Sequence, residues 1–142
     1  MEGTTSVERA EAETDRPEET TTRPVLQILL VEDEATLRQV IARNLSAYGH
    51  TVLQAATGAD ALYELAAHEP DLILLDINLP DLTGWEVLRL MRGRGQVVPT
   101  VVISAVRVSQ ARIEEFQPLA YLPKPFPLES LLRVVGDIHV HD

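Results

Sequence analysis

Four short segments of this 142-residue chain place reactive side chains at or directly after the end of an apolar run. Glu32 and Asp33 follow ILLV, and Asp76 ends DLILLD. Ser104 ends PTVVIS, and Lys124, the only lysine of the chain, stands between two prolines in YLPKPF. Carboxylates can bind a divalent cation, and an aspartate can accept a phosphoryl group as a nucleophile. If the fold brings the four segments together, they form a site suited to phosphoryl chemistry.

The charges in such a cluster predict a bound cation. Two carboxylates about 5 Å apart repel each other by roughly 3 kcal/mol at an effective dielectric constant near 20. One lysine cannot neutralise three acids, so a further positive charge is needed. A site of a few carboxylate oxygens suits Mg²⁺, or the similarly hard Mn²⁺. The chain has no cysteine, and none of its four histidines follows one of these apolar runs, which argues against a soft-metal site.

Lysine suits the remaining position of this site better than arginine does. Its ammonium is a compact point charge with three donors, whereas the guanidinium of arginine favours a flat, bidentate contact. Pro123 and Pro125 stiffen the chain on both sides of Lys124. The pattern therefore predicts that Lys124 faces an anion.

The elements that must position these residues alternate between strand and helix. Strands are predicted at 26–32, 51–55, 71–76, 99–104 and 120–122, and helices at 35–48, 58–68, 85–92, 109–116 and 128–138. Nearly continuous apolar strands are typical of a parallel sheet buried on both faces. The alternation predicts an α/β fold, a doubly wound parallel sheet in a three-layer sandwich. Ligands of such sheets bind outside the carboxyl ends of the strands, where the reactive residues are expected to meet.

Each of these residues also has an ordinary structural role open to it. Asp33 stands where a helix N-cap would, and Asp76 or Ser104 could simply begin a turn or cap a strand end. Lys124 could be a solvated surface charge, and Trp85 is expected to pack in the core. The coincidence of four strand ends favours a shared site over four separate explanations.

Composition limits the classes of function. A net charge of −10 argues against binding to a nucleic-acid backbone. The chain has neither an apolar run long enough to span a membrane nor a signal peptide, so we expect a soluble cytoplasmic protein. Residues 1–24 hold seven acids and few apolar side chains, which predicts a disordered acidic tail before a domain at 25–142. Such a tail is either a plain solvated extension or a contact for a partner.

The segments ILLVEDE, DLILLDINLPDLTGWEVL, VVISA and AYLPKPF, in this order and at this spacing, resemble the receiver domain of bacterial two-component response regulators. The resemblance extends over residues 25–138 and implies a flavodoxin-like (βα)5 fold with strand order 2-1-3-4-5. It also implies that Asp76 is the phosphoacceptor. Glu32 and Asp33 match the acidic pair of the family, with Asp33 as a direct Mg²⁺ ligand. Asn78 matches the position whose backbone carbonyl also binds the metal.

The same resemblance assigns three further positions. Ser104 matches the hydroxyl residue that turns toward the phosphoryl group, and Lys124 matches the lysine of the site. Tyr121 matches the aromatic switch residue, whose ring moves inward when Ser104 moves. The Lys124–Pro125 peptide bond is expected to be cis. The stretch from Ser104 to Lys124 is shorter than usual and lacks the glycine that typically ends the fourth helix, which predicts a short or frayed helix.

These inferences lead to one main hypothesis and one alternative. The main hypothesis is a stand-alone, single-domain response regulator, because the chain ends after the fifth predicted helix. A sensor histidine kinase or a phosphotransfer protein would phosphorylate Asp76, and the changed domain would bind a downstream protein or pass the phosphoryl group on in a phosphorelay. We expect a monomer or weak homodimer, and a signalling domain rather than an enzyme. The alternative is a receiver-fold interaction module that works independently of phosphorylation.

Two enzyme classes fit less well. An aspartyl-phosphatase would carry its nucleophile after the first strand, whereas Asp76 follows the third. A nucleotide-binding role lacks the G-x-x-x-x-G-K-[ST] loop, and GRG at 93–95 follows a helix and has no third glycine.

Overall fold

The structure is a computed structural model that describes residues 24–138. Five strands and five helices alternate along the chain. The strands are β1 (Gln27–Val31), β2 (Thr51–Ala55), β3 (Leu72–Asp76), β4 (Thr100–Ser104) and β5 (Ala120–Pro123). The helices are α1 (Ala35–Ala47), α2 (Gly58–Ala67), α3 (Gly84–Gly93), α4 (Gln110–Phe116) and α5 (Leu128–Gly136). Every strand pairing is parallel, and the strand order is β2-β1-β3-β4-β5, which confirms the predicted fold.

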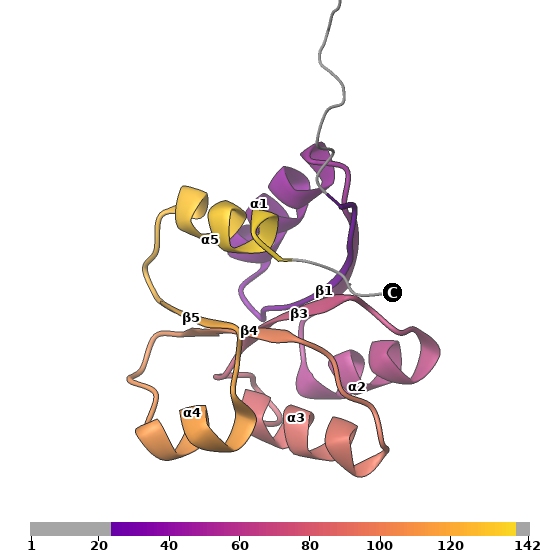
Figure 1. The fold of residues 1–142 in the computed structure, drawn as a ribbon, viewed down its shortest axis with the longest axis vertical. Coiled ribbons are helices and arrows are strands. Elements are labelled where there is room, and N and C mark those ends of the chain that lie inside the picture. Colours follow the sequence, from indigo (N-terminus) through magenta and orange to yellow (C-terminus); the bar gives the residue numbers. More distant parts are fainter. Residues whose placement is uncertain (1–23, 139–142) are drawn as a thin grey trace, which may run out of the picture.

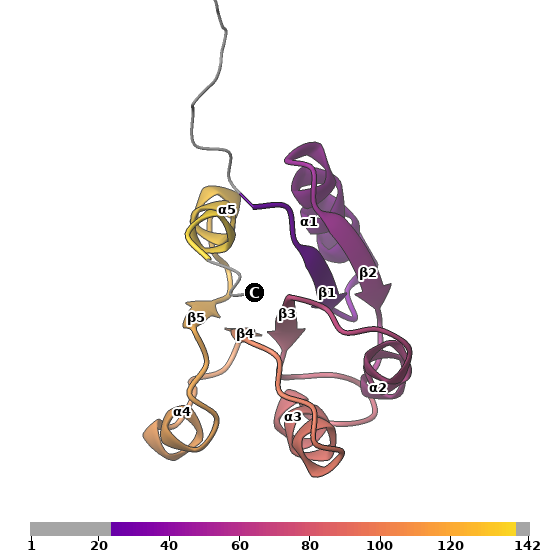
Figure 2. The ribbon, with the colours of Figure 1, turned by 45° about the vertical axis from the view of Figure 1, so that its right-hand side comes forward.

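The sheet forms the middle layer of a three-layer sandwich. Helices α1 and α5 cover one face, and α2, α3 and α4 cover the other (Figures 1 and 2). Successive side chains of a strand point to opposite faces, so Ile28 and Leu30 join the core under α1 and α5, whereas Leu29 and Val31 join the core under the other helices. Burial on both faces explains why β1, β3 and β4 are apolar almost throughout.

Helix α1 begins at Ala35 as predicted, but its N-cap is one residue later than expected. The N-cap is Glu34, whose side chain accepts a hydrogen bond of 2.9 Å from the backbone N–H of Leu37. The interpretation of Asp33 as an N-cap is therefore wrong, and its carboxylate has no capping role. Ile41 and Leu45 of this helix are fully buried.

Helix α4 is as short as expected, with seven residues. Its C-cap is Gln117, which adopts a left-handed conformation (φ 47°) at the position where a glycine is usual. Arg92 of α3 donates hydrogen bonds of 3.1 and 2.9 Å to the carbonyl oxygens of Glu115 and Phe116. These carbonyls belong to the last turn and have no partner within the helix. A side chain of α3 therefore helps to terminate α4.

Trp85 packs as predicted. It is 9 % exposed, and its ring stacks on that of Phe116 with 5.2 Å between the centroids. Among residues 24–138, no helix is long and apolar enough to cross a membrane. His139, His141 and the predicted acidic tail, apart from Pro24, lie outside the described residues.

Candidate functional site

The carboxyl ends of β1, β3, β4 and β5 lie side by side along one end of the parallel sheet. Val31 pairs with Leu75, Asp76 pairs with Ile103, and Ser104 pairs with Pro123. This register brings together the acids that follow β1, the acid that ends β3, the hydroxyl that ends β4 and the lysine that follows β5. The convergence predicted from four separate segments is thus present.

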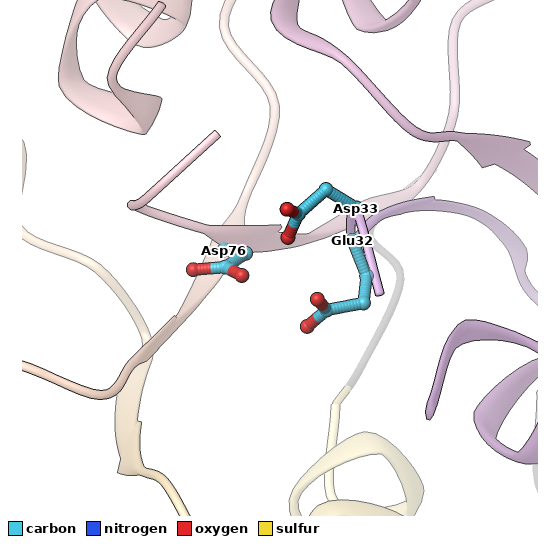
Figure 3. A group of neighbouring side chains, drawn as sticks. All are labelled: Glu32, Asp33 and Asp76. Atoms are coloured by element: carbon cyan, nitrogen blue, oxygen red, sulfur yellow. The ribbon is translucent and has the colours of Figure 1, made fainter. Parts of the chain in front are cut away.

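Three carboxylates share a small volume at this edge. One oxygen each from Glu32, Asp33 and Asp76 lies within 4.8 Å of the other two. Figure 3 shows the three carboxylates turned toward a common space. Glu32 and Asp76 are 0 % and 2 % exposed, whereas Asp33 is exposed. The cluster thus combines two buried acids with one that is open to solvent.

Lys124 points into this cluster. Its Nζ lies 2.9 Å from Oδ2 of Asp76 and 2.8 Å from Oε1 of Glu32. The backbone N–H of Lys124 donates to the carbonyl oxygen of Ser104 at 2.8 Å and holds the residue beside the end of β4. The Lys124–Pro125 peptide bond is cis, as expected. Burial lowers the pKa of Lys124, but the hydrogen bonds and charges of Glu32 and Asp76 outweigh that effect and raise it above its ordinary value. Lys124 therefore stays charged and faces anions.

The two carboxylate oxygens of Glu32 have different partners. Its Oε2 accepts from the N–H of Glu34 at 3.0 Å. Its buried Oε1 has the Lys124 ammonium, 2.8 Å away, as its one close polar partner. Burial raises the pKa of Glu32, and the charge of Asp76 adds to this, although Lys124 opposes both. A buried carboxylate oxygen that shares one lysine with Asp76, beside two further carboxylates, fits a hard divalent cation such as Mg²⁺.

The carboxylate of Asp76 is held from two sides. Lys124 binds Oδ2, and the N–H of Asn78 donates to Oδ1 at 3.0 Å. The loop that carries Asn78 returns close to the strand end, because the N–H of Gly84 donates to the carbonyl oxygen of Ile77 at 2.8 Å. A Cβ on Gly84 would lie 2.9 Å from the carbonyl oxygen of Asp76, so the fold requires glycine there. The loop therefore sets the orientation of the carboxylate.

Ser104 and Tyr121 both contact the backbone of Val106. The buried Oγ of Ser104 donates to the carbonyl oxygen of Val106 at 2.8 Å and accepts from its N–H at 3.1 Å. The hydroxyl of Tyr121 donates to the same carbonyl oxygen at 3.3 Å. Tyr121 is half-buried and packs against the core beneath α2, α3 and α4. The two residues expected to act as a switch therefore share one partner in the loop before α4.

Comparison with known proteins decides the family. Residues 28–136 match the response regulator receiver domain. The chain belongs to this family. The receiver is similar to response regulator MprA of Mycobacterium tuberculosis, with 39 % identity over 109 residues, which are 75 % of this chain and 47 % of MprA. It thus spans about half the length of the curated relatives that it matches.

Solved structures agree with the assignment. Chemotaxis protein CheY4 of Vibrio cholerae superposes on this receiver with a TM-score of 0.74 at 26 % identity, over 82 % of this chain and all of CheY4. Response regulator TrrA of Thermotoga maritima, solved in complex with Mg²⁺ and BeF, has a TM-score of 0.67 at 26 % identity over 77 % of this chain and 95 % of TrrA.

Sequence inspection missed two contacts of the receiver site. The guanidinium of Arg38 donates to the carbonyl oxygen of Glu32 at 2.8 Å, and it adds positive charge beside the acidic pair. The position of Arg38 one turn into α1 is the sequence feature from which this contact could have been predicted. The carboxylate of Asp81 binds the first N–H groups of α2, a contact across 23 residues that no local pattern indicates.

Proposed function

We propose that this receiver accepts a phosphoryl group on Asp76, in a Mg²⁺-dependent reaction, from a sensor histidine kinase or a phosphotransfer protein. The observation that carries the proposal is the contact of Lys124 with Asp76 inside a cluster of three carboxylates. Asp76 is the member of the cluster held from two sides, by the Lys124 ammonium and by the N–H of Asn78. A nucleophile fixed in this way loses little freedom when it reacts.

Glu32, Asp33 and Asp76, together with the backbone carbonyl of Asn78, would hold the Mg²⁺, or Mn²⁺ in its place. The fit rests on the all-oxygen donor set and on the buried Oε1 of Glu32, whose one close polar partner is an ammonium shared with Asp76. When bound, the cation supplies positive charge that offsets the carboxylates and the oxygens of the incoming phosphoryl group.

In the proposed reaction, an oxygen of Asp76 attacks the phosphorus of a phosphohistidine. The P–N bond breaks as the P–O bond forms, and the imidazole leaves with the electron pair. The ammonium of Lys124 balances negative charge on the transferred group. The hydroxyl of Ser104 then exchanges its bond to Val106 for one to a phosphoryl oxygen.

Loss of the Ser104 bond would change the loop before α4, because Tyr121 binds the same carbonyl oxygen of Val106. Phosphorylation thereby biases a two-state element, and the altered face binds a downstream protein or passes the phosphoryl group on. We propose further that the receiver acts in the cytoplasm as a signalling domain and does not turn over a substrate. We propose that it does so as a monomer or a weak homodimer.

Incubation with acetyl phosphate and Mg²⁺, followed by intact mass measurement, tests the phosphoacceptor. We expect one phosphoryl adduct in the wild-type protein, none after chelation of Mg²⁺, and none in Asp76→Asn, which keeps the shape of the side chain. An equal adduct in Asp76→Asn would contradict the assignment. Equal binding of a partner protein with and without the adduct would support a phosphorylation-independent module instead.

The stand-alone organisation is tested separately, by the mass of the protein isolated from its own cell. The sequence corresponds to 15.7 kDa. A substantially larger chain would show that the receiver works as part of a longer regulator.

A further inference from the structure

Asp81 fixes the outer end of the loop at 77–83 to the N-terminus of α2. Its Oδ1 accepts from the N–H of Gly58 at 2.8 Å, and its Oδ2 accepts from the N–H of Ala59 at 2.9 Å. The first N–H groups of a helix have no partner within it, and they favour a negative charge. These hydrogen bonds lower the pKa of Asp81, so its carboxylate is ionised at neutral pH. The contact joins two segments that are far apart in the sequence.

Close packing reinforces the same junction. A Cβ on Gly58 would lie 2.8 Å from Cβ of Leu82 and 3.2 Å from Oδ1 of Asp81. Any side chain at position 58 would therefore push the loop away from α2. The junction is fitted tightly enough that a single methyl group would open it.

The inner end of this loop reaches Asp76. Asn78 and Thr83 form an isolated antiparallel β-bridge that closes the loop. The N–H of Asn78 donates to Oδ1 of Asp76 at 3.0 Å. A short chain of contacts thus runs from α2, through Asp81 and the closed loop, to the carboxylate of Asp76.

We propose that Asp81 is a positioning residue for Asp76: by holding the 77–83 loop against α2, it holds the Asn78 N–H that orients the Asp76 carboxylate. Asp81 acts through Asn78 and takes no part in the chemistry. The expected effect of Asp81 on Mg²⁺ binding rests on the proposed function, whereas the effect of Asp81 on the loop does not.

The test compares Asp81→Ala with Thr57→Ala. Thr57 caps the same helix end by accepting from the N–H of Asp60 at 3.0 Å, in a contact made within α2 rather than with the loop. Both variants weaken the start of α2, but only Asp81→Ala releases the loop. Two readouts are measured: hydrogen exchange of the Asn78 amide in metal-free protein, by NMR, and the dissociation constant for Mg²⁺, by calorimetry.

We expect the Asn78 amide of Asp81→Ala to exchange about tenfold faster than in wild type, since its local opening becomes easier. The Mg²⁺ dissociation constant should rise about tenfold, as it does when an outer-shell support is lost. Thr57→Ala should change neither value by more than about twofold. Asp81→Asn keeps one acceptor oxygen and removes the charge, so an intermediate result is expected if hydrogen bonding is what matters.

The inference would be overturned if the Asn78 amide exchanged at the wild-type rate in Asp81→Ala. It would also be overturned if Thr57→Ala had an effect equal to that of Asp81→Ala. If Asp81→Ala does not fold, Gly58→Ala tests the same junction with the carboxylate intact, and faster exchange of Asn78 is again expected. A wild-type protein that binds no Mg²⁺ would sink the proposed function, and the exchange comparison alone would then decide the role of Asp81.

Discussion

The ammonium of Lys124 lies 2.9 Å from Oδ2 of Asp76, where the carboxyl ends of β3 and β5 approach the same edge of the sheet. The two residues are 48 positions apart, and the sheet alone brings them together. Side-chain exposures of 21 % for Lys124 and 3 % for Asp76 make this a largely buried ion pair. Removing one partner of a buried pair leaves the other charge uncompensated, so we expect the loss of Lys124 to affect stability as well as the proposed chemistry.

Lys124→Arg tests whether a positive charge at position 124 is sufficient or whether the compact ammonium group is required. Arginine keeps the positive charge, but its planar fork does not match a point contact shared by Glu32 and Asp76. We expect phosphorylation by acetyl phosphate to slow about tenfold or more, with folding retained. Lys124→Gln loses the charge and should lower the free energy of unfolding by about 2 kcal/mol in the absence of Mg²⁺, after allowance for partial exposure. A wild-type phosphorylation rate in Lys124→Arg would contradict the argument.

Asp33→Asn tests the electrostatic cost of the cluster. Asp33 is exposed, and its carboxylate lies within 4.8 Å of those of Glu32 and Asp76. Removing its charge should raise the free energy of unfolding of the metal-free protein by about 1 kcal/mol, because like charges no longer repel. The stabilisation that Mg²⁺ gives to wild type should fall in the variant. Thermal unfolding with and without Mg²⁺ measures both, and Glu69→Gln, an exposed acid at the opposite end of β3, serves as the control.

The reactive residues were predictable because apolar strands are easy to recognise and their carboxyl ends determine where the following residues lie. The positions of Asp76 and Ser104 follow from recognising the carboxyl ends of β3 and β4 alone. The N-cap of α1 was not predictable, since Asp33 and Glu34 are both acids able to cap the helix and only the backbone conformation selects Glu34. The contact of Asp81 with α2 joins segments with no shared periodicity, so the sequence alone gives no sign of it.

His50 makes stability depend on pH. Its Nδ1 accepts from the N–H of Leu26 at 3.1 Å, and burial lowers its pKa below the ordinary value of 6.5. As the pH falls below 6.5, the unfolded chain takes up a proton before the folded chain does, so the free energy of unfolding decreases. His50→Asn offers an acceptor oxygen that does not titrate.

Between neutral and mildly acidic pH, the free energy of unfolding of wild type should fall by about 1 kcal/mol more than that of His50→Asn, which is the value of one hydrogen bond. Denaturant unfolding at each pH measures this difference. His68→Asn is the matched control, because the His68 side chain is 41 % exposed. Parallel pH profiles for wild type and His50→Asn would show that the bond to Leu26 has no part in the pH response.

Arg92 is expected to hold the end of α4. Besides its bonds to the carbonyls of Glu115 and Phe116, its guanidinium lies 4.9 Å from the centroid of the Phe116 ring. A helix of seven residues is too short to be stable by itself, so contacts from α3 must supply the stability. Arg92→Gln should lower the free energy of unfolding by about 1–2 kcal/mol, because two carbonyls and the cation–π contact lose their partner.

Trp85, the only tryptophan, reports on this change because its ring stacks on Phe116. Arg92→Gln should shift its emission and speed hydrogen exchange in α4, while phosphorylation of Asp76 continues, since Arg92 contacts none of the residues around Asp76. Arg112→Gln removes only an exposed ion pair with Glu115 and should change stability by less than about 0.5 kcal/mol. If the two variants behave alike, α4 is held by general packing and Arg92 has no special part in ending it.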